Sequence, residues 1–497
     1  MASTAGVEYG TTAGRWILLA AVLGSGVAAL DATVVNVALP AIGKDLGAGV
    51  SGLQWVLTGY LITLAALILI GGSLGDRYGR RRVFVVGVMW FMLASVLCGV
   101  APSLGFLIAG RALQGIGGAL LTPGSLAMMQ ASFRPEDRGR AIGAWSGLGG
   151  IATAIGPFAG GWLISAVSWR LIFFLNVPLA AIVLVASRHV PESTDPTVSG
   201  RLDVAGASFG VIGLAGTTYA IIEAHSPGTA VAVAAVLGVV GLVGFVIVER
   251  RSRHPMLPLD IFASRQFTAA NLVTVAVYAA LGGVFFLLSV DLQQVLHYSP
   301  LKAGASLLPV TVIMLLLSAR AGALAQRIGP RLPMAVGPCI VALGLLIMRG
   351  IGPGGHYVSD VLPAVVVFGL GLALTVAPLT ATVMAAADAR HAGVASGVNN
   401  AVARAASLLA VALLPILAGL TGDDYRRPAA FSAGFHNAVT IAAGLCVAGG
   451  LIAVVGISNK DRAAPEPAGT DRKDGNVHLS CPVDAPPLRT LPADHAA

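Results

Sequence analysis

The sequence predicts an all-α integral membrane protein with fourteen transmembrane helices, in two six-helix bundles with two helices inserted between them. Composition supports this fold class, because the 497 residues are 56% hydrophobic and only 11% charged, with a mean hydropathy of +0.84. A soluble domain usually has about 25% charged residues. The apolar runs reach the roughly 20 residues that a helix needs to cross a bilayer. They are apolar throughout, whereas the strands of a transmembrane β-barrel alternate.

Each expected helix is an apolar run between polar or glycine-rich breaks. In chain order, the expected helices are residues 16–38, 53–72, 83–101, 105–129, 141–165, 170–187, 204–224, 230–249, 268–291, 303–326, 333–350, 360–385, 393–419 and 434–456. The domains that follow are an N-terminal segment (1–14), an N-terminal bundle (15–188), a linker with the inserted helices (189–266), a C-terminal bundle (267–456) and a tail (457–497). The tail is expected to be disordered, because it has too few large apolar residues to fold.

The positive charges predict the orientation in the membrane. Lys and Arg are concentrated in the loops that follow the even-numbered helices up to the twelfth, and cytoplasmic loops carry such an excess. Both termini are therefore expected in the cytoplasm. The net charge of +8 reflects this topology, so no nucleic-acid partner is expected. Arg far outnumbers Lys, which is typical of a high-GC bacterial genome and favours a bacterial plasma membrane.

The two bundles are predicted from an internal repeat. GSLGDRYGRR at residues 72–81 aligns with GALAQRIGPR at residues 322–331, and the same offset places Ser146-Gly147 on Ser396-Gly397. The first six helices therefore correspond to the last six in a parallel duplication.

Several classes of chemistry are disfavoured. Lys44 is the only lysine that follows a glycine, and Asp45 comes next, so the chain has no P-loop. The histidines lie in loops, at helix ends or in the tail, and the four cysteines are scattered singly. We expect no enzyme, no metal and no cofactor.

An acidic residue inside the first helix is the clearest functional signal. Asp31 lies well inside this helix, where a carboxylate costs about 2.5–3.5 kcal/mol by translocon scales and is a functional candidate by default. A rise of about 1.5 Å per residue places Asp31 and Arg111 at a similar depth. An intramembrane acid with such a partner is predicted to carry or gate a proton, and a purely structural ion pair is the alternative.

Two glycine-containing segments are predicted to control conformational change. The loop between the second and third helices contributes Gly72, Asp76, Arg77, Gly79, Arg80 and Arg81. Its glycines allow a short reversal, and Asp76 is expected to pair with the arginines or to cap the third helix; the alternative is a topology signal. The fifth helix contributes Gly156, Pro157, Gly160 and Gly161 as a hinge. Ordinary helix packing is the alternative for this segment.

Polar and aromatic residues inside the predicted helices are candidates for a substrate cavity. They are Tyr60, Gln114, Trp145, Asn271, Tyr278, Gln293 and Arg404. An apolar cavity with few fixed polar contacts suits a hydrophobic substrate.

These motifs resemble those of the major facilitator superfamily. The loop at residues 72–81 is similar to its helix 2–3 loop motif, and Arg111-Ala-Leu-Gln114-Gly115-Ile-Gly117 resembles its arginine motif. Gly156-Pro157-Phe-Ala-Gly160-Gly161 is similar to the motif of its exporting antiporters. LDATVVNVALP at residues 30–40 narrows the resemblance to the 14-helix drug:proton antiporters. The resemblance covers about residues 15–456 and implies the major facilitator fold.

The resemblance also implies a function. We expect proton-coupled efflux of hydrophobic drugs or antibiotics, cationic ones included, by alternating access. The expected partners are the small-molecule substrate, protons and the lipid bilayer, and a monomer is expected. Two alternatives stay open: an exporter of an endogenous metabolite such as a self-made antibiotic, and a non-transporting membrane sensor or scaffold. The sensor is disfavoured, because the sequence predicts no folded soluble domain.

Overall fold

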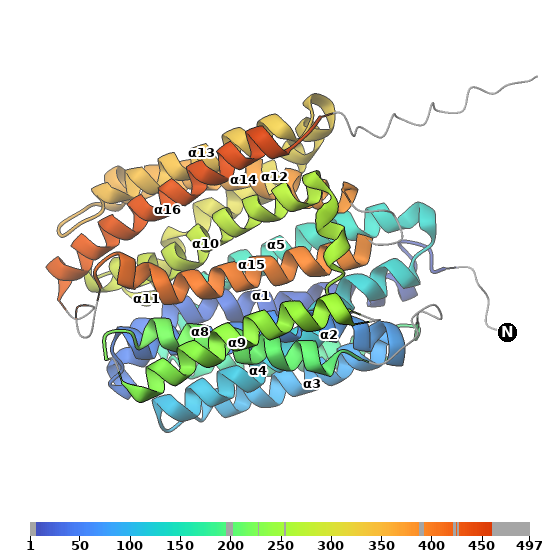
Figure 1. Ribbon diagram of the computed structural model, residues 1–497, viewed down its shortest axis with the longest axis horizontal. Coiled ribbons are helices and arrows are strands. Elements are labelled where there is room, and N and C mark those ends of the chain that lie inside the picture. Colours follow the sequence, from blue (N-terminus) through green and yellow to red (C-terminus); the bar gives the residue numbers. More distant parts are fainter. Residues whose placement is uncertain are drawn as a thin grey trace, which may run out of the picture. The chain divides into compact units, whose positions relative to one another are not determined.

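The computed structural model is almost entirely helical in the part of the chain that it describes (Figure 1). That part comprises residues 6–194, 202–226, 228–252, 255–386, 392–420, 424 and 427–459. The predicted disordered tail lies outside it from Lys460 on. Within these residues, twelve helices are long and apolar enough to cross a membrane. The all-helical membrane fold is therefore confirmed.

The N-terminal part of the chain forms seven helices. They are α1 (Thr12–Leu46), α2 (Val50–Tyr78), α3 (Arg80–Gly99), α4 (Leu104–Ser132), α5 (Pro135–Ala166), α6 (Leu171–Phe174) and α7 (Asn176–Ser187). Helix α4 packs along both α2 and α3, while α1 packs along α5 and α7. These contacts bring one face each of α1, α2, α3, α4 and α7 toward a shared interior.

Two further helices, α8 (Val204–Ile222) and α9 (Thr229–Arg251), pair closely with each other (Figure 1). Glycines permit the approach, since a Cβ added at Gly213 would lie 2.8 Å from the backbone nitrogen of Leu242. Helix α8 also contacts α2 and α15, so the pair lies beside both the N-terminal and the C-terminal helices.

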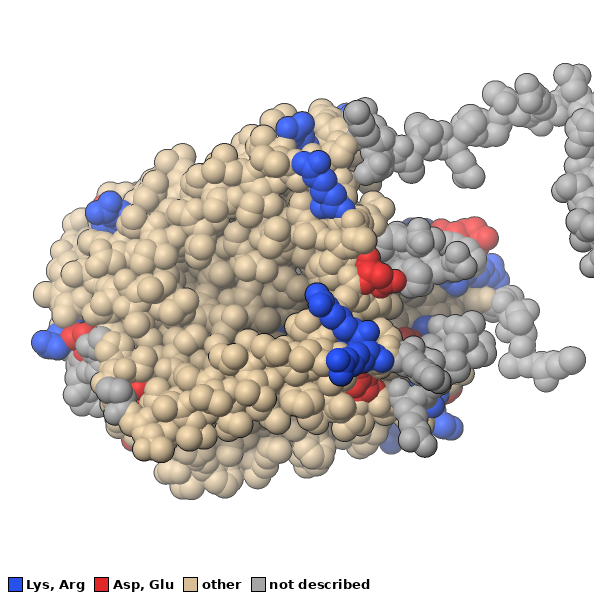
Figure 2. All heavy atoms as spheres, viewed as in Figure 1, with Lys and Arg blue, Asp and Glu red and all other residues tan. Residues whose placement is uncertain are grey.

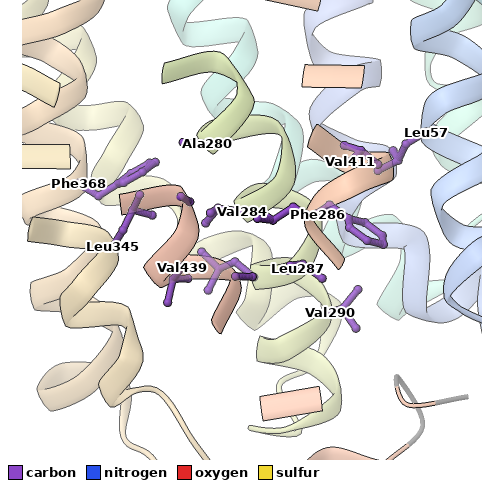
Figure 3. Packing of buried hydrophobic residues seen from close by; sticks show 14 of the residues in the cluster. Leu57, Ala280, Val284, Phe286, Leu287, Val290, Leu345, Phe368, Val411 and Val439 are labelled. Atoms are coloured by element: carbon purple, nitrogen blue, oxygen red, sulfur yellow. The ribbon is translucent and has the colours of Figure 1, made fainter. Parts of the chain in front are cut away.

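The C-terminal part contains the remaining elements. They are the 3-10 helix η1 (Leu259–Ala263), α10 (Arg265–Gln294), α11 (Pro300–Ser306), α12 (Leu308–Ile328), α13 (Arg331–Ile347), the short turns η2 (Met348–Gly350) and η3 (Tyr357–Val361), α14 (Leu362–Ala385), α15 (Ala392–Leu417) and α16 (Pro428–Gly456). Helix α10 is central, because it packs against α14, α15 and α16. Figure 3 shows Val284 and Leu287 of α10 near Val439 of α16, while Phe286 points toward the side of Val411.

Two predicted helices are interrupted, and proline explains both breaks. The segment at 170–187 divides at Leu175, where Pro178 lacks the N–H that would bond the carbonyl of Phe174. The segment at 303–326 divides at Leu307, two residues before Pro309.

The count of fourteen spans stays a prediction. The predicted span at 141–165 lies within α5, and the one at 170–187 corresponds to α6 and α7. The apolar helical segments found there, Ile155–Ala166 and Leu171–Ser187, are short.

Charged side chains lie toward the ends of the helices, as a membrane requires. Figure 2 shows Lys, Arg, Asp and Glu gathered toward two ends of the visible face, with a band free of them between. Large apolar side chains are exposed instead, such as Val239 and Leu451, each 62% exposed. A surface of this kind is stable only against lipid.

The N-terminal and C-terminal helices meet near the end of α1 at which Leu46 lies. The hydroxyl of Ser289 donates to the carbonyl of Asn36 over 2.7 Å, and the amide of Gln293 donates to the carbonyl of Val37 over 2.9 Å. From α2, the amide of Gln54 donates to the carbonyl of Val411 over 2.8 Å. We call this end the Leu46 face, and these contacts close it.

Candidate functional site

Asp31 and Arg111 are in direct contact. Nη1 of Arg111 on α4 lies 2.5 Å from Oδ2 of Asp31 on α1, and each side chain is only 1% exposed. Asp31 and Arg111, which the helix rise places at a similar depth, thus form an ion pair. It lies in the interior formed by the N-terminal helices, remote from either end of α1.

Three further side chains complete a polar network around Asp31. The amide of Gln114 donates to Oδ1 of Asp31 over 2.8 Å and to the hydroxyl of Ser95 over 2.8 Å. The amide of Asn176 donates to the same Asp31 oxygen over 3.0 Å and to Ser95 over 3.2 Å. Arg111 also donates to the side-chain oxygen of Gln114. Helices α1, α3, α4 and α7 are therefore connected through one buried carboxylate.

The guanidinium of Arg111 is held on its other sides as well. Its Nε donates to the carbonyl of Val56 on α2 over 3.2 Å, and its carbon lies 4.4 Å from the centre of the Tyr60 ring. The ring of Phe173 lies 5.8 Å away. Arg111 can pair with the aromatic face of Tyr60 as well as with Asp31.

The sequence analysis did not assign Ser95 and Asn176 to this network. Ser95 is one polar residue in an apolar helix, a signal too common to single out. Asn176 is one uncharged polar residue in the segment FFLNVP at residues 173–178, so nothing in the sequence relates it to Asp31. Gln114, predicted in the substrate cavity, is fully buried beside Asp31 instead.

The loop between α2 and α3 is built around Gly79. Asp76 forms an ion pair with Arg80 at 2.8 Å, as the sequence predicts. Glu192, which follows α7, accepts from the backbone N–H groups of Arg81 and Arg82 over 3.0 and 3.2 Å, and so caps α3. Gly79 has φ +112°, and a Cβ there would lie 2.7 Å from the Glu192 carboxyl carbon.

The same arrangement recurs in the C-terminal part. The side-chain oxygen of Asn459, which follows α16, accepts from the backbone N–H of Arg331 at the start of α13 over 3.2 Å. Gly329 has φ +94°, and a Cβ there would overlap the amide of Asn459. The repeat thus extends to a capping residue that follows the last helix of each half.

The predicted hinge on α5 packs against two other helices. Val34 of α1 lies against Gly160, and Thr33 lies against Gly156. Gly161 packs on Leu301 of α11, where an added Cβ would lie 2.7 Å from the Leu301 Cα. A Cβ added at Gly304 of α11 would likewise overlap the carbonyl of Pro157 on α5. These glycines therefore form part of the closed Leu46 face, and the choice between hinge and packing stays open.

Comparison with known proteins identifies the family. The model of the Major Facilitator Superfamily matches residues 21–411. The chain belongs to this superfamily.

Named relatives in this superfamily are resistance and export proteins. The multidrug resistance protein Stp of Mycobacterium tuberculosis is 36% identical over 77% of this chain and 72% of its own length. The puromycin resistance protein of Streptomyces alboniger is 36% identical over 80% of each chain. The tetracenomycin C resistance and export protein of Streptomyces glaucescens is 35% identical over 80% of this chain and 74% of its own.

Solved transporter structures share the fold. A bacterial homologue of the human lysosomal transporter Spinster, in an inward-facing and unoccupied conformation, has a TM-score of 0.65 and 16% identity, and the match covers 92% of this chain and 99% of that one. A peptide transporter in complex with sulfate has a TM-score of 0.66 and 15% identity, over 90% and 96%. At such identities the likeness concerns the fold alone.

The other predicted cavity residues of this superfamily member lie in different places. The indole of Trp145 donates to Ser25 of α1 over 2.8 Å. Asn271 accepts from the amide of Asn399 on α15 over 3.2 Å. Gln293 belongs to the Leu46 face, as described above. The structure does not bring these three side chains together.

Tyr60, Tyr278 and Arg404 lie on α2, α10 and α15, and α15 packs against both other helices at one meeting point. The hydroxyl of Ser407, one turn further along α15, donates to the backbone carbonyl of Tyr278 over 3.0 Å. This meeting point lies next to the ion-pair network, because Tyr60 also contacts Arg111.

Two charged side chains have positions that the sequence analysis did not anticipate. Arg320 lies inside α12 and donates to the carbonyl of Leu316 over 2.9 Å. Asp291 was expected at a helix end, but α10 continues to Gln294 and Asp291 is fully buried. Neither of its carboxylate oxygens has a hydrogen-bond partner in the described structure.

Proposed function

We propose that the protein exports hydrophobic drugs or antibiotics across a bacterial plasma membrane in exchange for protons. One observation carries the efflux: relatives 35–36% identical over about four fifths of the chain are multidrug or antibiotic resistance and export proteins. Export of an endogenous antibiotic fits the same relatives, and retention of a metabolite in a deletion strain would distinguish it.

The proposed topology has fourteen spans and cytoplasmic termini. Helix α5 and the α6–α7 segment would each cross the membrane in addition to the twelve helices described above. Bundles 15–188 and 267–456 would then move against each other, with α8 and α9 inserted between them in the chain. The excess of Lys and Arg in the loops on the side of Gly79 and Gly329 supports this orientation.

In this orientation, the Leu46 face is the outer face, and the structure is closed there. Alternating access requires that the contacts of Ser289, Gln293 and Gln54 across this face break when it opens. The glycines of α5 would allow close contact in one state and separation in the other.

Asp31 is the proposed proton carrier. Protonation would remove the negative charge that Arg111, Gln114 and Asn176 contact. It would leave Arg111 as a buried and uncompensated charge, which is unfavourable by several kcal/mol. Relief of this energy by movement of α1 against α4 and α7 would couple the proton to the conformation.

The test is dye uptake by everted vesicles that contain the exporter. Wild-type vesicles should accumulate lipophilic dyes, and a protonophore should abolish the accumulation. Asp31→Asn, which cannot exchange a proton, should abolish uphill accumulation, and Asp31→Glu should keep part of it.

The matched control is Asp291→Asn, which removes another fully buried acid, and accumulation should persist. Uphill accumulation at a normal rate in Asp31→Asn would show that the proton is carried elsewhere. Wild-type vesicles that accumulate no dye would contradict the export function.

A further inference from the structure

The charged residues deep inside the helices do not balance. In the described part of the chain, four charged side chains lie at least seven residues from both ends of their helices; these are Asp31, Arg111, Arg320 and Arg404. Asp31 and Arg111 compensate each other at 2.5 Å. The other two are both positive, and neither has an acidic partner among the described residues. At this distance from the helix ends, the described residues therefore include one acid and three arginines.

Arg404 is the stronger candidate for a functional role of these two arginines. It lies halfway along α15, about 18 Å from Ala392 at a rise of about 1.5 Å per residue. Arg320, by contrast, is exposed and already donates to its own helix. An arginine near a helix end can extend its side chain to the membrane surface, but one at the midpoint cannot reach it easily.

The surroundings of Arg404 come from both halves of the protein. Tyr60 of α2 belongs to the N-terminal helices, and Tyr278 of α10 belongs to the C-terminal helices. Helix α15 packs against both of these helices, and its Ser407, one turn beyond Arg404, donates to the backbone carbonyl of Tyr278 over 3.0 Å. The Tyr60 ring also lies against Arg111. Arg111 is compensated by Asp31, whereas Arg404 has no acidic partner among the described residues.

The N–H donors of the Arg404 guanidinium have no hydrogen-bond partner among the described residues. A guanidinium carries five N–H donors in a planar fork, and Arg404 makes no hydrogen bond or ion pair among the described residues. Its side chain is partly buried, so it is neither sealed in the core nor fully solvated. A charge held at mid-membrane without a protein partner marks a place where an acceptor binds.

We propose that Arg404 binds an anionic group of the exported compound, a carboxylate or an ionised phenol or enol on an otherwise apolar molecule. The planar fork matches such groups with two parallel hydrogen bonds. This inference rests on the proposed export function and specifies its substrate class. Tyr60 and Tyr278, on the two helices that pack against α15, would supply aromatic surface for the apolar part of the compound.

Among the residues that the structure describes, a cationic compound finds no equivalent partner beside Arg404. The Asp31 carboxylate is fully enclosed and already accepts from three side chains. Asp291 is fully buried as well, near the end of α10 at Gln294. A cation at the meeting point of α2, α10 and α15 would face the positive charge of Arg404 instead.

The test compares two dyes with the same tricyclic skeleton and opposite charge. Fluorescein is anionic at pH 7.5, and rhodamine 123 is cationic. Their uptake is measured in everted vesicles with wild type, Arg404→Gln, Arg404→Lys and no exporter. The matched control is Arg349→Gln, which removes the same charge from an exposed position in η2, directly after α13.

Wild type should take up fluorescein faster than rhodamine 123. Arg404→Gln should lower fluorescein uptake about tenfold or more, equivalent to about 1.4 kcal/mol, and leave rhodamine 123 uptake unchanged or higher. Arg404→Lys should keep part of the fluorescein uptake, because it keeps the charge without the planar fork. Arg349→Gln should leave uptake of both dyes as in wild type.

Three results would overturn the inference. Wild type that prefers rhodamine 123, or an equal loss of both dyes in Arg404→Gln, would show that Arg404 does not select anions, while export itself stands. Uptake of neither dye by wild type would contradict the proposed function and the inference with it. If Arg404→Gln fails to insert, the ratio of the two dyes in Arg404→Lys decides, and an unchanged ratio counts against the inference.

Discussion

The carboxylate of Asp31 accepts hydrogen bonds from Arg111, Gln114 and Asn176, so a single proton on this residue changes the contacts of three helices. A purely structural ion pair would have the same geometry, but its role would not require Asp31 to bind and release a proton. The two interpretations differ in what happens when both charges are removed together. Stability would then recover in either case, whereas coupled transport recovers only if the pair is merely structural.

Arg111→Met should destabilise the protein by about 3–5 kcal/mol, because it leaves a buried carboxylate without its partner. Adding Asp31→Asn to Arg111→Met should restore most of this loss, since neither charge remains. The double variant should nevertheless fail to export uphill. Unfolding in detergent, followed by tryptophan fluorescence, and vesicle uptake measure the two effects.

The control is a second, more exposed ion pair, whose acidic residue also lies on α1. Asp45 and Arg170 contact each other at 2.6 Å with 45% and 34% of their side chains exposed. The double variant Asp45→Asn/Arg170→Met should change stability by less than about 1 kcal/mol. Uphill export by the Asp31→Asn/Arg111→Met protein would reduce the buried pair to a structural role.

At the scale of elements, the two halves end in the same way. Glu192 follows α7 and caps α3 across Gly79, and Asn459 follows α16 and caps α13 across Gly329. Each glycine has a positive φ and no room for a side chain. The last helix of each half is thereby fastened to the start of its third helix, and this fixes the loop on that side.

Glu192→Ala should lower the free energy of unfolding by about 0.5–2 kcal/mol, the usual cost of a lost helix cap, and should reduce export. Asn459→Ala should do the same in the other half. The control is Glu8→Ala, which removes an exposed pair with Arg134 and should cost less than about 1 kcal/mol. Thermal unfolding and dye uptake at matched expression check this. Equal behaviour of Glu192→Ala and Glu8→Ala would mean that the cap does not support the loop.

The helices were predictable because lipid permits only continuous apolar runs with internally bonded backbones. Depth along a helix was predictable as well, which is why Asp31 and Arg111 could be matched from their distance to the helix ends. The neighbours of a side chain on the surrounding helices were not predictable from the sequence. Ser95 and Asn176 are neutral and common, and only the packing of α3 and α7 on α1 brings them to Asp31.

The capping residues escaped prediction for a different reason. Glu192 lies in a polar segment without periodicity, and its counterpart Asn459 differs from it in charge and in offset along the sequence. Only the common use of a side-chain oxygen at a helix start relates them. The breaks at Leu175 and Leu307 follow from nearby prolines, but proline is also tolerated in the first turn of a helix, so sequence alone favours neither outcome.

For the whole molecule, the close contact between α5 and α11 has the largest consequence. Gly161 lies against Leu301, and Gly304 lies against Pro157. Neither glycine has space for a Cβ. Side chains there would hold the two halves apart at the Leu46 face. We therefore propose that alternation between states depends on these two positions, although neither carries a polar group.

Gly161→Val should shift the protein toward a state in which the Leu46 face is open. An added Cβ would lie 2.5 Å from the carbonyl oxygen of Pro300, so α5 and α11 cannot keep their present distance. Overpacking of this kind costs about 1–3 kcal/mol, which changes an equilibrium between two states by roughly 5- to 150-fold. Export should fall, because the closed outer state becomes rare. The readout is labelling of an introduced thiol, Val37→Cys, which is 1% exposed in the closed structure.

The background protein has its four cysteines replaced by serine, and a membrane-impermeant maleimide is added to intact cells. Labelling should rise several-fold in Gly161→Val over the background. The matched control is Gly444→Val on α16, where an added Cβ meets no atom within 4 Å and labelling should not change. Loss of export without increased labelling would contradict a role in closing this face and would favour bending of α5 itself. If Gly161→Val is not labelled in intact cells but is labelled after the cells are permeabilised with detergent, the Leu46 face lies on the cytoplasmic side and the proposed topology is reversed.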